Sequence, residues 1–390
     1  MASWPLALDS QERCRRLIDL FLVSVLLDAG AGTRWQYKSK ESGKIYRRSE
    51  GLAVASIEMF KAGYFSNNAL EPCQVDTVGL RRLTVQRLAT GLQVSDSNPI
   101  QGLEGRASLL TKLAEALKNS HLFGAEGRPG HMIGRHTVVH RLKCLLIPLD
   151  YLLAHPTTQA TSVPVIIIPT LWSVLANGLA TIWPASRVQI DGISVGDAWP
   201  CKGMPASPPA QPWENIAPFH KLTQWMCYSL MTPMTKLLNV KFAGTELLTG
   251  LPEYRNGGLF VDTGLLTLKK HEMERGLKNF RSNGSQKGQN SVEVVPLFDV
   301  SDSVVVEWRA ATVGLLDDLL GDVNRSLGLQ GTDKINLAQM LEAGSWKVRG
   351  FTPEMSRELT DTQGGRELAE VSRPNTKEPP IMILSDGTVF

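Results

Sequence analysis

The sequence has little net charge and no long basic run. Its 390 residues include 41 lysines and arginines against 38 aspartates and glutamates, which gives a formal net charge of +3 at pH 7. Nucleic acids and anionic membranes attract proteins through clustered positive charge. We therefore expect neither nucleic acid nor a membrane as a partner.

Cysteine is scarce, and no two cysteines form a C-x-x-C pair. An odd number of widely separated thiols is typical of a reducing compartment, and the segment 1–10 is too short and too interrupted to be a signal peptide. We therefore expect a cytoplasmic protein. The five cysteines are Cys14, Cys73, Cys144, Cys201 and Cys227.

No apolar run is long enough to cross a membrane. Residues 156–186 carry no charge, but Pro164 and Pro169 interrupt them. The remaining helical part, residues 170–182, is shorter than the roughly 20 residues that a membrane-spanning helix needs. We expect a buried core helix there.

Signatures of common nucleotide and cofactor sites are missing as well. The sequence contains no P-loop, dinucleotide fingerprint, nucleophile elbow or H-E-x-x-H motif. The glycine-rich stretch 28–37 follows a predicted helix, whereas phosphate-binding loops usually follow a strand, so a helix end and turn is the favoured interpretation. Trp35 within it could still stack on a planar ligand. We expect no cofactor.

One group of residues has spacings that suggest zinc. His136, His140 and Cys144 would share one helix face, with His131 shortly before them. Side chains spaced along one straight helix splay along its axis and rarely converge on one ion. We expect no metal at this place.

What the sequence does contain is a series of amphipathic helices. Apolar residues recur at helical spacing between capping residues, and 43% of the residues are hydrophobic, enough for a large core. We expect a mainly α fold with a few short strands, forming one domain over residues 1–390. The predicted helices cover residues 11–29, 49–62, 76–90, 106–119, 170–182, 216–239 and 301–328.

Three segments are expected to lie outside helices. Residues 201–213 are rich in proline and small residues, and residues 278–291 are polar, so both predict loops. The extended end of the chain predicts a small hairpin about Asp386-Gly387.

The stretch 248–266 mixes charged and apolar residues and predicts a half-buried polar site with a closely approached backbone. A structural Glu–Arg pair beside a glycine turn is the alternative. Its polar members are Glu253, Tyr254, Arg255, Asn256 and Asp262, with two glycines before Asp262.

Three other places offer polar groups. Ser49 suits an N-cap and Glu50 a first helical turn, while the pair Arg47-Arg48 could hold an anion at that helix start. A second place is a helix face that carries His220, Lys221, Gln224 and Tyr228. A third is the helix 301–328, in which Glu307 and Arg309 flank Trp308; one of them could enter the core to meet Glu253 or Arg255, or both could be solvated.

Motifs throughout the chain resemble the uncharacterised protein family of the fungal and bacterial uracil-catabolism (URC) pathway. That family is found with a uracil phosphoribosyltransferase and a cyclohydrolase-like enzyme, so the resemblance implies association with other uracil-catabolism enzymes. The motifs are residues 24–32, 48–56, 98–106, Pro218-Phe-His-Lys-Leu, 248–258, Val306-Glu-Trp-Arg309 and Ser385-Asp-Gly-Thr-Val-Phe390.

The chain departs from that family in two places. Family members carry an N-terminal segment with a His-Ser-Arg-Trp-Arg-His-Phe stretch, which this sequence lacks. In addition, residues 134–149 have the character of an insertion. Either departure bears on the activity of this particular chain.

A second resemblance suggests the chemistry. Lys221-x-x-Gln224, the Glu253-Tyr-Arg motif and Glu307-x-Arg309 follow the order of the queuosine-nucleotide N-glycosylases, which are α-helical and resemble DNA glycosylases. Those enzymes have Asp-Tyr-Arg where this chain has Glu253-Tyr-Arg. The resemblance therefore implies an N-glycosidase that hydrolyses a ribosylurea, or its phosphate, to urea and ribose (phosphate).

The resemblance also implies roles for single residues. Glu253 would be the catalytic carboxylate and Asp262 a second one. The basic groups Arg48, Lys221 and Arg255 would hold a 5′-phosphate. The other residues expected to bind this nucleoside- or nucleotide-derived substrate are Trp35, Glu50, His220, Gln224, Tyr254, Asn256 and Arg309.

Two alternatives stay open. One is an amidohydrolase-like enzyme of the same pathway that opens a ureido bond with His220 as the base, releasing ammonia or carbon dioxide. The other is a non-catalytic partner that scaffolds the pathway's enzymes.

Overall fold

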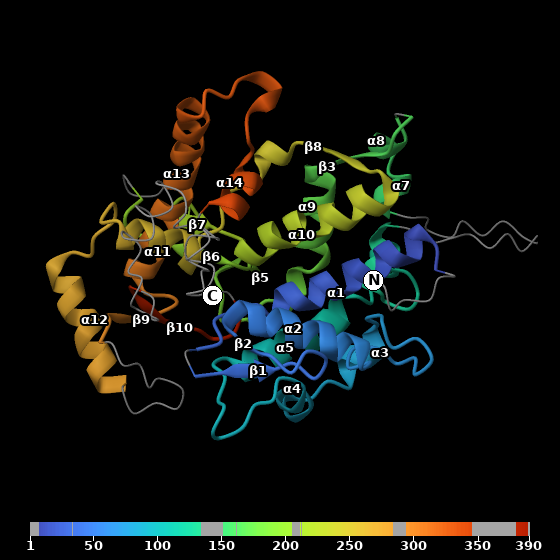
Figure 1. Cartoon of the computed structure of the whole chain (residues 1–390), viewed down its shortest axis with the longest axis horizontal. Coiled ribbons are helices and arrows are strands. Elements are labelled where there is room, and N and C mark those ends of the chain that lie inside the picture. Colours follow the sequence, from blue (N-terminus) through green and yellow to red (C-terminus); the bar gives the residue numbers. More distant parts are fainter. Residues whose placement is uncertain are drawn as a thin grey trace, which may run out of the picture. The chain divides into compact units, whose positions relative to one another are not determined.

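The fold of this computed structural model is mainly α-helical, as predicted (Figure 1). The structure describes residues 8–32, 34–133, 151–160, 162–204, 211, 213–283, 294–344 and 380–388. Its α-helices are α1 (Ser10–Leu27), α2 (Arg48–Lys61), α3 (Thr77–Arg81), α4 (Val85–Gly91), α5 (Leu103–Ala116), α6 (Ser120–Phe123), α7 (Tyr151–Ala154), α8 (Pro156–Gln159), α9 (Ile168–Gly178), α10 (Lys221–Leu238), α11 (Tyr254–Asp262), α12 (Lys270–Asn283), α13 (Ser303–Ser326) and α14 (Leu337–Ala343).

The strands are short and pair two by two. The antiparallel pairs are β1 (Gln36–Lys38) with β2 (Ile45–Arg47), β4 (Gln189–Ile190) with β5 (Ile193–Ser194), and β6 (Ala198–Pro200) with β7 (Ile216–Pro218). The parallel pairs are β3 (Val165–Ile167) with β8 (Lys241–Ala243), and β9 (Leu297–Asp299) with β10 (Met382–Leu384).

The contacts of the chain divide it into two compact units. Unit 1 holds residues 1–196, 222–247 and 387–389, and unit 2 holds residues 197–221, 248–386 and 390. One family domain over the whole chain therefore stays a prediction.

In unit 1, a buried arginine fixes the end of α1. Arg106 is fully buried; its Nε donates to the Leu27 carbonyl at 3.0 Å and its Nη2 to the Ala29 carbonyl at 2.7 Å. These bonds satisfy carbonyls that a helix end leaves without an intrahelical donor. The helix ends at Leu27, two residues before the predicted end.

A buried ion pair holds the middle of α1. The Asp19 carboxylate is fully buried and accepts hydrogen bonds from Arg128 Nε and from the Gly130 N–H, each at 2.6 Å. Burial raises the pKa of Asp19, while the Arg128 charge opposes that rise. The loop that contains Arg128 and Gly130 is thereby fastened to α1.

Two predicted helix boundaries were wrong because local capping differs. The predicted helix 76–90 is two helices, since Asp76 accepts from the Gly79 N–H and caps α3, while Thr84 accepts from the Arg87 N–H and caps α4. Ser49 is not an N-cap, since α2 already begins at Arg48, whose φ is +52°.

The predicted helix 216–239 was wrong in its first turn. Residues 216–218 form β7, and His220 has a φ of +47°, so α10 begins only at Lys221. The predicted loop 278–291 was wrong at its start, because α12 runs to Asn283. Phe280 anchors this last part of α12 in a cluster with Val295, Leu297 and Met382; residues 284–291 lie outside the described part.

The predicted C-terminal hairpin was also wrong. β10 pairs with β9 in parallel, and Ile381, Met382 and Ile383 are all buried. Strands buried on both faces read as continuous apolar runs, which suits parallel pairing. Gly387 turns away with a φ of +79°, and a Cβ there would lie 2.1 Å from the Gly102 carbonyl oxygen.

The uncharged segment 156–186 contains a short core helix, as its prolines suggest. It forms α8, β3, α9 and a 3-10 turn over Ala180–Ile182, and Leu171 and Leu175 of α9 are buried. Across the described ranges, no helix has the length and apolar character needed to span a membrane. The predicted insertion 134–149 lies outside those ranges.

Candidate functional site

The candidate site in unit 2 is built on a buried aspartate. Asp197 directly precedes β6 and is fully buried, and Arg309 of α13 is 1% exposed. The guanidinium donates with Nη1 to Oδ1 at 2.8 Å and with Nη2 to Oδ2 at 2.7 Å. Such two-pronged pairing fixes both side chains in one geometry.

Asp197 also accepts hydrogen bonds from neighbouring segments. Its Oδ1 accepts from Trp199 Nε1 at 2.6 Å, and its Oδ2 accepts from the Lys221 N–H at 2.9 Å. Its backbone carbonyl accepts from the N–H groups of Phe219 and His220 at 3.0 and 2.9 Å. Asp197 thereby holds together β6, the turn before α10 and the middle of α13.

These partners stabilise the ionised form of the Asp197 carboxyl group. Burial raises the pKa of the carboxyl, but the Arg309 charge and the hydrogen bonds more than offset this and lower the pKa to about 2. With both oxygens engaged, Asp197 is suited to position its neighbours rather than to attack a substrate.

The turn before α10 presents two of the predicted site residues. His220 is half-buried, and burial, with a contribution from the Arg309 charge, lowers its pKa although Asp197 opposes the shift. Its imidazole is therefore neutral at pH 7 and can accept a proton. Lys221 beside it is 5% exposed. The Arg309 guanidinium also lies 4.2 Å from the centre of the Phe219 ring, within the range of a cation–π contact.

Glu253 begins α11. It is half-buried, and its Oε1 accepts from the Asn256 N–H at 2.9 Å, which makes it the N-cap. Asn256 is fully buried, and its Nδ2 donates to the Leu251 carbonyl at 2.6 Å. A helix start favours a negative charge, and the hydrogen bond to Asn256 fixes the orientation of the Glu253 carboxyl group.

The glycines after Asn256 lie inside α11, so they do not form the glycine turn of the alternative interpretation. Trp308 Nε1 donates to the Gly257 carbonyl at 3.0 Å. A Cβ on Gly257 would lie 2.7 Å from Thr312 Oγ1 and 2.8 Å from Trp308 Nε1. Gly257 thus lets α11 lie directly on α13, where Trp308 and Arg309 are neighbours.

The structure gathers only part of the predicted site. Arg309 pairs with the Asp197 side chain, and the backbone N–H groups of His220 and Lys221 also donate to Asp197. Glu253 accepts from the Asn256 N–H. Asp262, half-buried, is the last residue of α11. Tyr254 and Arg255 lie in the first turn of α11, and their side chains are outside the described part.

Four predicted residues lie in unit 1. Trp35 is 1% exposed and its Nε1 donates to the Leu92 carbonyl at 2.9 Å, so its ring fills the core rather than facing a ligand. Arg48 and Glu50 are exposed on the first turn of α2, and Gln224 is buried on α10.

Asp197 and Trp199 were missed by the sequence analysis. The signal was a single carboxylate in the apolar extended segment 195–201, where an unpaired charge would be costly. In the ranges that the structure covers, no three His, Cys, Asp or Glu side chains gather as a metal site; His136, His140 and Cys144 lie outside them.

Comparison with known proteins gives two kinds of match. The family model described as "Protein of unknown function (DUF1688)" matches residues 1–390. The chain is 42% identical over 388 residues to "Uracil catabolism protein 4" of Lachancea kluyveri, covering 98% of this chain and 79% of that protein. It is 40% identical over 382 residues to "Protein urg3" of Schizosaccharomyces pombe, covering 98% and 77%.

Proposed function

This chain belongs to the DUF1688 family, and we propose that it acts in uracil catabolism as an N-glycosidase. The proposed reaction hydrolyses a ribosylurea, or its 5′-phosphate, to urea and ribose or ribose phosphate. The pathway is supported by the name of the Lachancea kluyveri relative. We further propose that it associates with other uracil-catabolism enzymes in the cytoplasm.

The observation that carries the proposed reaction is the fixed carboxylate of Glu253. Its Oε1 accepts from the Asn256 N–H at the start of α11, and Asn256 is buried. A charge that is already oriented needs no rearrangement when positive charge develops nearby, which is the basis of electrostatic catalysis.

A carboxylate of this kind assists the cleavage of an N-glycosidic bond. As the bond between the sugar C1′ and the urea nitrogen breaks, the bonding electrons leave with the nitrogen and positive charge develops on the sugar ring. Glu253 stabilises that charge or orients the water that attacks C1′. The water oxygen becomes the new hydroxyl of the sugar, and a water proton ends on the urea nitrogen.

The surroundings of Asp197 favour an anionic substrate. The Asp197–Arg309 pair is neutral as a whole, and the Lys221 backbone N–H donates to Asp197, which brings a lysine to this part of unit 2. We propose that Lys221 and Arg255 serve the 5′-phosphate, and that Asp262 is a second carboxylate of the site.

The test is urea release by the purified protein from ribosylurea and from its 5′-phosphate. Glu253→Gln retains an oxygen for the Asn256 N–H but removes the charge, so we expect activity to fall at least ~100-fold. Glu253→Asp keeps both the charge and the cap but withdraws the carboxylate by one methylene, so we expect partial activity.

A capping control separates catalysis from stability. Asp302 caps α13 in the same unit by accepting from the Val304 N–H at 3.0 Å. Asp302→Ala should lower the melting temperature and leave urea release per folded molecule unchanged. Equal urea release by wild-type protein and Glu253→Gln would refute the proposal.

His220 favours a second candidate function. Its neutral, half-buried imidazole beside Asp197 suits a general base that opens a ureido bond. That reaction releases ammonia or carbon dioxide instead of intact urea, and His220→Gln would abolish it. A non-catalytic scaffold would release neither product, and pathway flux would survive Glu253→Gln.

A further inference from the structure

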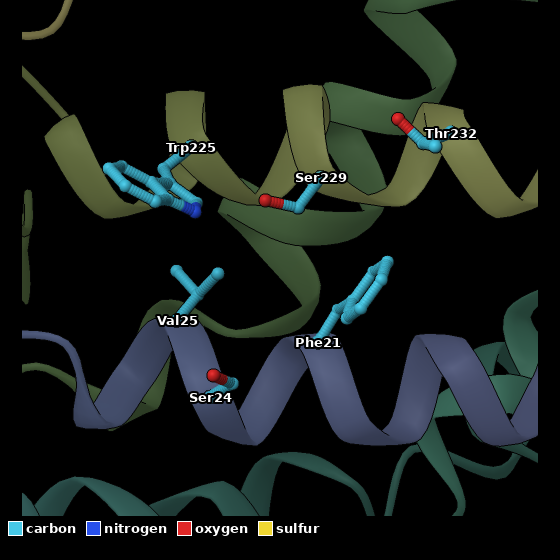
Figure 2. A pocket seen from close by; sticks show the side chains of 6 residues that line it. All are labelled: Phe21, Ser24, Val25, Trp225, Ser229 and Thr232. Carbon is cyan, nitrogen blue, oxygen red and sulfur yellow. The ribbon is translucent and has the colours of Figure 1, made fainter. Parts of the chain in front are cut away.

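Unit 1 contains an open cavity, a hollow at its surface between two of its helices. It has a volume of about 310 Å³ and lies between α1 and α10 (Figure 2). That volume falls at the lower end of the range of ligand pockets, about 300–1,000 Å³. The lining residues are Phe21, Ser24 and Val25 on α1, and Trp225, Ser229 and Thr232 on α10.

The cavity arises from the spacing of small residues on the facing helices. Ser24 follows Phe21 by three residues, and Ser229 and Thr232 follow Trp225 by four and seven, so each set forms one stripe. Figure 2 shows Phe21 and Val25 pointing from α1 toward α10, and Trp225 and Ser229 on the side of α10 that faces α1. A serine where a larger side chain could pack leaves space between the aromatic rings.

Of the three lining residues that carry a hydroxyl group, Ser24 and Ser229 are half-buried and Thr232 is exposed. Ser56 and Thr312 donate to the carbonyl four residues earlier, each at 2.7 Å. In the described part of the chain, Ser24, Ser229 and Thr232 make no hydrogen bond to protein. Each can therefore donate one and accept two hydrogen bonds from a molecule in the cavity.

A proline adds a backbone acceptor to the same turn. Pro233 lies inside α10 and has no N–H, so the Ser229 carbonyl loses the donor that a helix normally supplies four residues later. This turn of α10 thus combines the hydroxyls of Ser229 and Thr232 with a carbonyl that lacks the N–H donor four residues later.

We propose that this cavity binds a small, uncharged, planar ring that carries amide groups. Among the residues that the structure describes, no ionisable side chain lines it, so the lining offers no counter-charge to a charged ligand. Phe21 and Trp225 offer aromatic surface for a flat ring, and the hydroxyls suit neighbouring N–H and C=O groups. The proposal does not rest on hydrolysis, because binding is measured without turnover.

The test is equilibrium dialysis of the full chain with uracil as the probe, beside uridine 5′-monophosphate and toluene. We expect uracil to bind and the nucleotide to bind at least ~10-fold more weakly. Ser229→Ala/Thr232→Val removes two hydroxyls with little change in shape and should weaken uracil binding ~10-fold or more, without weakening toluene binding.

Three further variants locate the site. Thr235→Val changes an exposed threonine of α10 outside the lining and should leave uracil binding unchanged, as should Glu253→Gln. Ser24→Leu fills the space from the α1 side and should abolish it. The proposal is overturned if folded wild-type protein binds no uracil at millimolar concentration, if toluene alone binds, or if the double variant binds uracil as tightly as wild type.

Discussion

Asp197 and Glu253 show how one functional group takes two roles in unit 2. The Asp197 carboxylate accepts four hydrogen bonds, two of them from a buried guanidinium. The Glu253 carboxylate is half-buried and accepts from the first turn of α11. The first is suited to fix geometry, and the second is suited to act on a bound molecule.

Removing the Asp197 charge should destabilise unit 2. Asp197→Asn leaves Arg309 buried without its counter-charge, and we expect a loss of about 3–5 kcal/mol in the free energy of unfolding. The control is Asp322→Asn, which breaks the exposed Asp322–Arg325 pair on α13 and should have little effect. Urea denaturation measures both. A loss no larger for Asp197→Asn than for the control would contradict this role.

The low pKa of Asp197 predicts how that difference depends on pH. Its folded-state pKa is about 2, below the ordinary value of 3.8. The stabilisation is therefore fully present above about pH 4 and is lost as the pH falls toward 2. The unfolding free energies of wild-type protein and Asp197→Asn should converge over this range. A gap that stays constant from pH 6 to pH 2 would argue against the ionised pair.

Two cysteines should resist thiol reagents in the native protein. Burial raises the pKa of Cys14 and of Cys227 to about 12 each, so neither forms appreciable thiolate at pH 8. Cys73, only partly buried, serves as the reactive comparison. Peptide mapping after brief treatment with a disulfide reagent should find label on Cys73 before Cys14 or Cys227, and labelling of all three at one rate would contradict the expectation.

At the scale of single residues, the sequence indicated which polar residues belong to the site but not which of them interact. Arg309 was predicted in the site, either solvated or drawn toward the stretch 248–266. Its partner is Asp197, 112 positions earlier in the chain. Nothing in a single sequence pairs two such distant charges, because the pairing depends on where β6 and α13 lie in the fold.

Among the elements, α13 organises unit 2. Asp302 caps its start by accepting from the Val304 N–H. Trp308 and Arg309 bind α11 and Asp197 respectively, and Leu316 limits the space at Gly250. The motif Val306-Glu-Trp-Arg309 therefore joins α13 to α11 and to Asp197, in addition to supplying polar groups.

A methyl group on Gly257 should disturb the contact between α11 and α13. The Cβ of Gly257→Ala would lie within 3.0 Å of three atoms of Trp308 and Thr312, and we expect about 1–3 kcal/mol of destabilisation. Gly314→Ala is the matched control on α13, since its Cβ would meet nothing within 4 Å and alanine favours a helix by up to ~1 kcal/mol. Thermal unfolding should lower the melting temperature of the first variant and not of the second; the reverse order would contradict the proposed packing.

Helices with a strong apolar stripe and a capping residue could be predicted from the sequence. The boundaries that were wrong depended on distant partners. The start of α10 depends on the Asp197 carboxylate that meets the Lys221 N–H, and β10 depends on β9 for its pairing. The glycine turn considered at Gly257 was wrong because this glycine serves a contact with Trp308, which is distant in the sequence.

For the whole molecule, the division into two units predicts which segments a destabilising substitution affects. Asp197→Asn acts on contacts within unit 2, so hydrogen exchange should rise in β6, β7 and α13 and stay near the wild-type rate in α1, α2 and α5 of unit 1. Mass-spectrometric exchange of both proteins measures this. An equal rise throughout the chain would show that the two units unfold as one.

The parallel strand β10 and the turn after it set an order of events during synthesis. Residues 382–384 join unit 2, but Gly387 lies against Gly102, and Thr388 Oγ1 accepts from the buried Arg187 of unit 1. A ribosome must therefore translate residues 248–386 before unit 1 can gain its last partners. Until then Gly102 lacks its contact with Gly387, and Arg187 lacks its hydrogen bond to Thr388. A premature stop codon before position 387 would release a chain in which unit 1 never forms these two contacts.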